Sequence, residues 1–223
     1  MKPIAVIQGI PRGKGNHNLN PGQEVEEERK IRRIRISVYA PVGVVGYPGS
    51  GRKTLAHRFG HMKETDVFNE EVPVKDLYGC HKLGELESGW LYRILLKLYI
   101  IDPENLRSRN PPLRLREWNE FCCMVIVFDI TEKKTFHAVP QYLNILREDY
   151  FEIQENFFIV GNKSDLRRAD ETRHTQVTKR SASRMASLLG GTYYECSAKQ
   201  NRDVRHLLFP IRKCALKVRY VID

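Results

Sequence analysis

The sequence contains no apolar run that approaches the roughly 18 residues of a membrane-spanning helix. Its N-terminus also lacks the apolar core of a signal peptide, so we expect a cytoplasmic protein. Met1 is followed by Lys2 instead of the glycine that myristoylation needs, and the fourth-last position carries no cysteine for a prenyl group. Membrane attachment is therefore expected only at the periphery, through partners or basic charge.

The cysteines show neither the number nor the spacing of a disulfide framework or a zinc site. The five cysteines are odd in number and none stands in a C-x-x-C pair, which argues against a disulfide framework and against a zinc site. They are Cys80, Cys122, Cys123, Cys196 and Cys214. This usage fits a reducing compartment.

The chain also lacks a concentrated charge signal. Its net charge is +10, which would suit nucleic acid or anionic lipid, but the basic residues are spread along the sequence. No motif combines aromatic and basic residues as nucleic-acid binders do. We therefore do not expect nucleic acid as a partner.

The 223 residues, 41% of them hydrophobic, suffice for one domain with a proper core and an extension. Residues 1–33 are rich in Gly, Pro and Asn without a sustained period, and this composition predicts a flexible N-terminal arm. Within the arm, Ile4–Ile7 could form a strand fragment or a docking tail. The folded domain is predicted to cover residues 34–223.

Apolar strand-like runs alternate with helical patterns over that domain, which predicts an α/β fold with a mostly parallel sheet and helices on both faces. Pro41 is expected to break or bulge the first strand. The runs 76–83 and 90–101 are joined by a turn-rich stretch and are expected to form an antiparallel edge hairpin. Further strands are expected at 34–39, 42–45, 122–130, 157–160 and 192–195, and helices after Thr54, over 136–146, at 182–189 and over 204–218.

A glycine-rich turn at residues 46–54 has the residue types of a phosphate-binding loop. Such a loop follows G-x-x-x-x-G-K-[ST], in which backbone N–H groups and Lys bind phosphates and the hydroxyl binds Mg²⁺. Here Arg52 stands at the lysine position, and Lys53 and Thr54 come one position late. Either Arg52 is a bulged insertion and Lys53 and Thr54 keep their roles, or Arg52 replaces the lysine and Lys53 displaces the hydroxyl. We favour the bulge, because Leu55 then begins a helical apolar face; taken alone, the stretch would be interpreted as a turn without a ligand.

Two more polar loops follow expected strands: Asn162-Lys163-Ser164-Asp165, and Ser197-Ala198-Lys199 after Glu195. The three loops in this order resemble the small GTPases of the Ras superfamily over about residues 34–219. The resemblance implies a three-layer fold of the P-loop NTPase type, GTP or GDP as cofactor, and Mg²⁺ held by Thr54 and Asp102. The implied nucleotide-binding set is Gly46, Gly49, Ser50, Gly51, Arg52, Lys53, Thr54, Leu55, Asn162, Lys163, Asp165, Ser197, Ala198 and Lys199.

The base-binding chemistry can be argued from the residues themselves. The carboxylate of Asp165 only accepts hydrogen bonds and can take two from adjacent N–H donors, an edge that guanine has and adenine lacks. Asn162 and the stem of Lys163 could join loops and cover the base. Backbone N–H groups of residues 197–199 would bind the guanine carbonyl, as the resemblance implies. The alternative is that Asn162 and Asp165 only form an Asx-type turn.

The sequence departs from the family where γ-phosphate and water are handled. The family has D-x-x-G followed by a glutamine that orients the attacking water, whereas this chain has Asp102-Pro103-Glu104-Asn105-Leu106. We therefore expect slow or absent GTP hydrolysis. Thr65 is a candidate γ-phosphate sensor, although a surface threonine is the commoner interpretation.

These patterns favour two functional hypotheses over a third, a nucleic-acid or anionic-membrane binder that uses the positive charge. The first is a guanine-nucleotide switch in signalling or trafficking, which binds an effector or regulator through loops 63–75 and 103–116. The second is a pseudo-GTPase, a scaffold that binds a protein partner without nucleotide cycling.

Overall fold

The computed structural model describes residues 34–60, 77–85, 91–103, 121–149, 156–167 and 176–219. The predicted arm at 1–33, the loop 63–75 with Thr65, and nearly all of the loop 103–116 lie outside these ranges. Asn105 and Leu106 lie outside them as well. The expectations for these segments stay predictions.

Six described strands form one sheet in the order β2-β3-β1-β4-β5-β6. All neighbouring pairs are parallel except β2 with β3, which is antiparallel at one edge. The predicted mostly parallel α/β sheet is confirmed, while the turn that would join β2 to β3 lies outside the described residues. The strands are β1 Ile34–Gly46, β2 Leu77–Glu85, β3 Leu91–Ile101, β4 Cys123–Asp129, β5 Phe157–Asn162 and β6 Thr192–Glu195.

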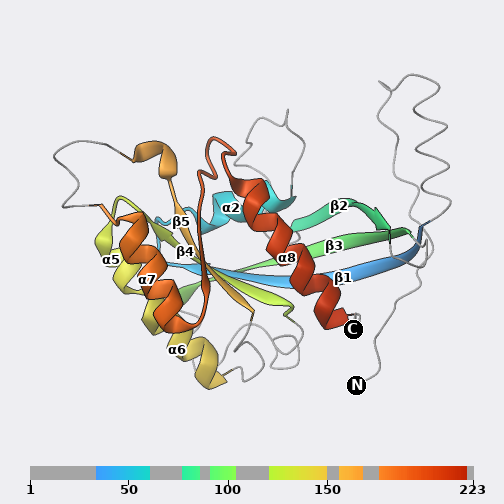
Figure 1. Ribbon diagram of the computed structural model, residues 1–223, viewed down its shortest axis with the longest axis horizontal. Coiled ribbons are helices and arrows are strands. Elements are labelled where there is room, and N and C mark those ends of the chain that lie inside the picture. Colours follow the sequence, from blue (N-terminus) through green and yellow to red (C-terminus); the bar gives the residue numbers. More distant parts are fainter. Residues whose placement is uncertain are drawn as a thin grey trace.

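Helices cover both faces of the sheet (Figure 1). They are α2 Arg52–Gly60, α5 Lys133–His137, α6 Val139–Asp149, the short 3-10 helix η3 Ser164–Leu166, α7 Lys179–Leu189 and α8 Val204–Arg219. One core cluster packs α2 and α8 against the sheet, and the other packs α6 and α7 against the opposite face. Every residue of β4 is buried, as expected for a central strand with helices on both sides.

The expectation of a break at Pro41 is wrong, because β1 runs through it without interruption. The ladder with β4 begins only at Val42, so the missing N–H of Pro41 removes no bond from it. The Pro41 carbonyl still accepts a hydrogen bond from the N–H of Cys122 (2.9 Å). The one irregularity recorded between β1 and β3 lies between Ile34 and Ile36.

Candidate functional site

Three predicted loops follow β1, β5 and β6, three strands that run in the same direction. Parallel strands bring their carboxyl ends to one edge of a sheet, where ligands of open α/β folds bind. Asp102 follows β3 and Asp129 ends β4 at the same edge. The topology therefore gathers residues that lie far apart in the sequence.

The glycine loop between β1 and α2 has the backbone conformation that its sequence requires. Gly49 and Gly51 both have φ of +84°, a left-handed conformation that favours glycine. A Cβ on Gly51 would also overlap Nδ2 of Asn162, so the Asn162 side chain packs directly against the loop and leaves no room for a side chain at position 51. Ser50 is fully buried, and its Oγ has no hydrogen-bond partner among the described residues.

Arg52 does not bulge out of the loop, which corrects the interpretation favoured from the sequence. Helix α2 begins at Arg52 directly after Gly51, so the six-residue spacing from Gly46 is kept and no residue is inserted. Arg52 is only 7% exposed. Its guanidinium donates one hydrogen bond to the Gly46 carbonyl (3.1 Å) and one to Oδ2 of Asp102 (3.2 Å). Arg52 therefore occupies the lysine position of the phosphate-binding pattern.

With Arg52 at the lysine position, each of the next three residues falls one position later in the pattern than predicted from the sequence. Lys53 is exposed and takes the position of the magnesium-binding hydroxyl in the pattern, while Thr54 is half-buried one position later. Leu55 lies in the core, and its N–H is taken by the Gly51 carbonyl (3.0 Å). Of these three predicted site residues, Leu55 thus has a packing role.

Asn162 at the end of β5 joins all three loops. Its Nδ2 donates to the Ser50 carbonyl (3.0 Å), and its Oδ1 accepts from the N–H of Ala198 (3.0 Å). Asn162 is 2% exposed, so these bonds are shielded from water. The predicted joining role of Asn162 matches this geometry. A base carbonyl would share the Ala198 N–H with Asn162 or use the N–H of Lys199.

Asp165 lies beside the third loop. Its Oδ1 accepts a hydrogen bond from Oγ of Ser197 (2.5 Å), and the same Oγ accepts from the N–H of Gln200 (3.1 Å). The N–H of Ser164 donates to the Cys196 carbonyl (3.1 Å), a second link between the two loops. One oxygen of the Asp165 carboxylate is thus fixed while the group stays half-exposed.

Two residues that sequence reasoning did not single out complete the site. Asp129 is 2% exposed, and its Oδ2 lies 2.6 Å from Nζ of Lys163. Arg58 on α2 donates to the carbonyls of Ala198 (2.8 Å) and Lys199 (2.9 Å). Asp129 could have been found from its place at the end of a buried apolar run, whereas no sequence signal marks Arg58 because its partners are backbone atoms 140 and 141 residues away.

Apart from the metal position, the residues of the three loops fit a guanine nucleotide at both its phosphate end and its base end. The first N–H groups of a helix have no acceptor within the helix and attract phosphate, and α2 begins directly after two left-handed glycines. The orphaned Ser50 hydroxyl and the Arg52 guanidinium offer further donors to an anion. Asp165 offers a carboxylate to the N–H edge of a base.

The same loop does not fit Mg²⁺. This ion needs oxygen ligands in near-octahedral geometry, and the pattern supplies a hydroxyl and a carboxylate for it. Here an ammonium group stands at the hydroxyl position, and the Asp102 carboxylate is bound to Arg52. Among the described residues no group of three or more His, Cys, Asp or Glu side chains could hold a metal ion.

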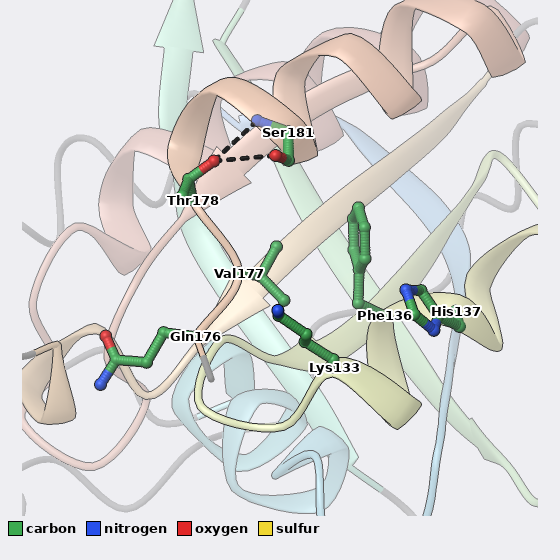
Figure 2. A pocket seen from close by; sticks show the side chains of 7 residues that line it. All are labelled: Lys133, Phe136, His137, Gln176, Val177, Thr178 and Ser181. Carbon is green, nitrogen blue, oxygen red and sulfur yellow. Dashed lines mark hydrogen bonds between the residues drawn. The ribbon is translucent and has the colours of Figure 1, made fainter. Parts of the chain in front are cut away.

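A pocket of about 400 Å³ lies between α5 and the start of α7 (Figure 2). It is lined by Lys133, Phe136, His137, Gln176, Val177, Thr178 and Ser181. The cap of α7 lies at one side of the pocket, where Oγ1 of Thr178 accepts from the N–H of Ser181 (3.1 Å). The pocket contains none of the predicted nucleotide-binding residues.

The sequence model of the Ras family matches residues 112–217 of this chain. The human Ras-related and estrogen-regulated growth inhibitor is 38% identical over 165 residues, which cover 73% of either chain. This chain belongs to the Ras family. The predicted membership in the Ras superfamily is thereby confirmed, and the three loops can be compared with relatives of known class.

Two other relatives of this Ras-family chain are matched over smaller parts of their own length. Ras-related protein RabJ of Dictyostelium discoideum is 35% identical over 94 residues, 41% of this chain and 34% of the relative. Human GTP-binding protein REM 2 is 28% identical over 166 residues, 74% of this chain and 45% of the relative. The chain thus spans less than half the length of these two relatives. Within the described residues, we find no helix with the length and apolarity to cross a membrane.

Proposed function

We propose that this chain is a guanine-nucleotide-binding protein that acts as a switch in signalling or trafficking. The observation that carries the proposal is the Asn162 side chain, which ties the glycine loop to the loop at residues 197–199. This arrangement connects the loop before α2 with the loop that bonds Asp165, so a single nucleotide would contact both the start of α2 and the Asp165 carboxylate. The membership in the Ras family and the name of human GTP-binding protein REM 2 support the same function.

In the proposed complex, each group has a definite task. The start of α2 and the Arg52 guanidinium bind the phosphates, and Asp165 accepts two N–H bonds from guanine. The Lys163 stem covers the base, because its ammonium is held 2.6 Å from the buried carboxylate of Asp129. The nucleotide supplies the β- and γ-phosphates, whose presence would order loops 63–75 and 103–116 for a protein partner.

Nucleotide titration tests this proposal. The wild-type chain should bind fluorescent GDP and GTP and not the corresponding ATP analogue. Asp165→Asn should weaken GDP binding by at least about tenfold, because a hydrogen bond to a charged group contributes roughly 1.5–3 kcal/mol. Asp203→Asn is the matched control, since the Asp203 carboxylate is exposed and pairs with His206 outside the three loops. Equal affinity for guanine and adenine nucleotides would contradict the proposal.

We also propose that hydrolysis is slow. Asn105 and Leu106 stand where the family has a glycine and a water-orienting glutamine, and Arg52 binds Asp102, the carboxylate at the start of the same segment. Phosphate release measured under single turnover should be far below that of an active small GTPase. A brisk rate would show that another residue orients the water.

One observation favours the pseudo-GTPase scaffold as a second candidate. The guanidinium of Arg52 donates hydrogen bonds to the Gly46 carbonyl and to the Asp102 carboxylate, so these two acceptors have partners in the absence of a nucleotide. A scaffold of this kind would hold its fold and bind a protein partner while failing to bind any nucleotide. Absence of guanine binding in the titration, together with a folded wild-type chain, would favour this candidate.

A further inference from the structure

The start of α2 differs from a magnesium-binding loop at two adjacent positions, Arg52 and Lys53. Because no residue is inserted between Gly46 and Arg52, the mismatch cannot be relieved by a bulge that returns Lys53 and Thr54 to the usual places. Thr54, which the sequence had offered as the magnesium ligand, lies one helical position past the one that carries the hydroxyl in the pattern. An α-helix turns by about 100° per residue, so a shift of one position points a side chain in another direction.

The remaining candidate ligand is also engaged. Asp102 is the carboxylate that the sequence offered for Mg²⁺, and the nearly buried guanidinium of Arg52 donates to it (3.2 Å). Asp102 is 48% exposed, and an ion pair with such exposure contributes little by itself, so the pair alone would not keep a divalent ion away. Mg²⁺ binding is instead prevented by the change at position 53, where an ammonium group replaces the hydroxyl of the pattern. Mg²⁺ gives up its water only for well-placed oxygens.

Arg52 and Lys53 also supply what a divalent ion would otherwise bring to the phosphates. Both are cations at the N-terminus of α2, where the helix dipole and the first N–H groups already favour negative charge. The planar guanidinium of Arg52 can donate two parallel hydrogen bonds to phosphate oxygens, which the lysine of the usual pattern cannot do. The charge lost with the metal is therefore replaced by the side chains of this chain itself.

From this juxtaposition we infer that the chain binds guanine nucleotide without Mg²⁺, with Arg52 and Lys53 in its place at the phosphates. The inference rests on the proposed function and adds its ion requirement. Release of nucleotide from this chain is then insensitive to removal of divalent ions, so a regulator could not act by displacing the metal.

The test measures release of fluorescent GDP into excess unlabelled GDP, with millimolar Mg²⁺ or with EDTA. For the wild-type chain we expect the two rates to agree within about twofold. Restoring the pattern with Arg52→Lys/Lys53→Thr should create a dependence, with EDTA accelerating release by about tenfold or more, the scale of one lost charge-assisted contact. The matched control is Arg184→Lys/Lys213→Thr, which makes the same changes at exposed positions on α7 and α8 and should release GDP as the wild type does.

Each result decides a separate point. Acceleration of about tenfold by EDTA in the wild-type chain would overturn the inference and leave the proposed function standing. A restored variant that stays insensitive to EDTA would overturn the assignment to Arg52 and Lys53. A wild-type chain that binds no guanine nucleotide in either buffer would refute the proposed function, and the inference with it.

Discussion

Gly51 lies where the glycine loop meets the side chain of Asn162. Its φ is +84°, and an added Cβ would overlap Nδ2 of Asn162, the atom that donates to the Ser50 carbonyl. Gly51→Ala should therefore lower the free energy of unfolding by roughly 2–4 kcal/mol, the sum of a left-handed conformation and a displaced buried hydrogen bond. Urea unfolding followed by fluorescence measures this change.

Gly49→Ala is the matched control, since Gly49 has the same φ of +84° but no atom of the described residues, its chain neighbours aside, lies within 4 Å of its Cβ position. Only the conformational cost of about 1–2 kcal/mol should remain. Equal losses in the two variants would mean that the contact between Gly51 and Asn162 contributes nothing to stability. Guanine binding should fall more steeply for Gly51→Ala, because Asn162 would move away from Ala198 as well.

Arg52 shows why this part of the site could not be predicted from the sequence. Counting from the two glycines puts Arg52 at the lysine position, while counting from the pair Lys53 and Thr54 makes it an insertion. Periodicity could not separate the two, because either leaves Leu55 and Phe59 in the core. The decision depends on partners distant in sequence, and the Asp102 carboxylate lies 50 residues further along the chain.

At the scale of elements, the sequence predicted well those helices whose ends depend on a residue at the end itself, such as a glycine cap or a proline. Helix α7 ends at Gly190, which has φ of +78° and donates to the carbonyls of Ala186 and Ser187, as a left-handed C-terminal cap does. Pro140 lies inside the helix predicted over 136–146, and in the structure it stands in the first turn of α6, where its missing N–H costs nothing. These outcomes need no knowledge of the rest of the fold.

Strand β1 was predicted less well for the opposite reason. The effect of Pro41 depends on where the neighbouring strand begins, and β4 joins the ladder only at Val42. The same limit applies to the candidate site. Asn162 and Asp165 were found from their place after a buried strand, but the roles of Asp129 and Arg58 come from contacts across the sheet and between loops.

At the scale of the whole molecule, the loops of the site are carried by strands that also form the hydrophobic core. The loops stand on β1, β5 and β6, and each of these strands is fixed by its neighbour and by helices on the two faces. Cys196 belongs to both: it is fully buried in one core cluster, and its carbonyl accepts the hydrogen bond from Ser164 in the second loop. Conditions that loosen the core around Cys196 should therefore disturb the base-binding loops.

Alkaline pH is such a condition. Burial raises the pKa of the Cys196 thiol to about 12 and that of Cys214 to about 11, and burial also raises the pKa of Cys123. In the unfolded chain a thiol titrates near about 8.5. Above this pH the unfolded state loses protons that the folded state keeps, so the free energy of unfolding falls as pH rises and is highest below the unfolded pKa. Urea unfolding of the reduced protein at several values between about pH 8 and 10 should show this fall.

The variant Cys196→Ala isolates one thiol. It should be less stable than the wild type near neutral pH because it leaves a small cavity, but its stability should fall less steeply with pH. The difference in slope for one thiol is at most about 1.4 kcal/mol per pH unit. Parallel curves for the two proteins would mean that Cys196 ionises as readily in the folded chain as in the unfolded one. Loss of GDP binding over the same pH range in the wild type, with a smaller loss in the variant, would tie the buried thiol to the base-binding loops.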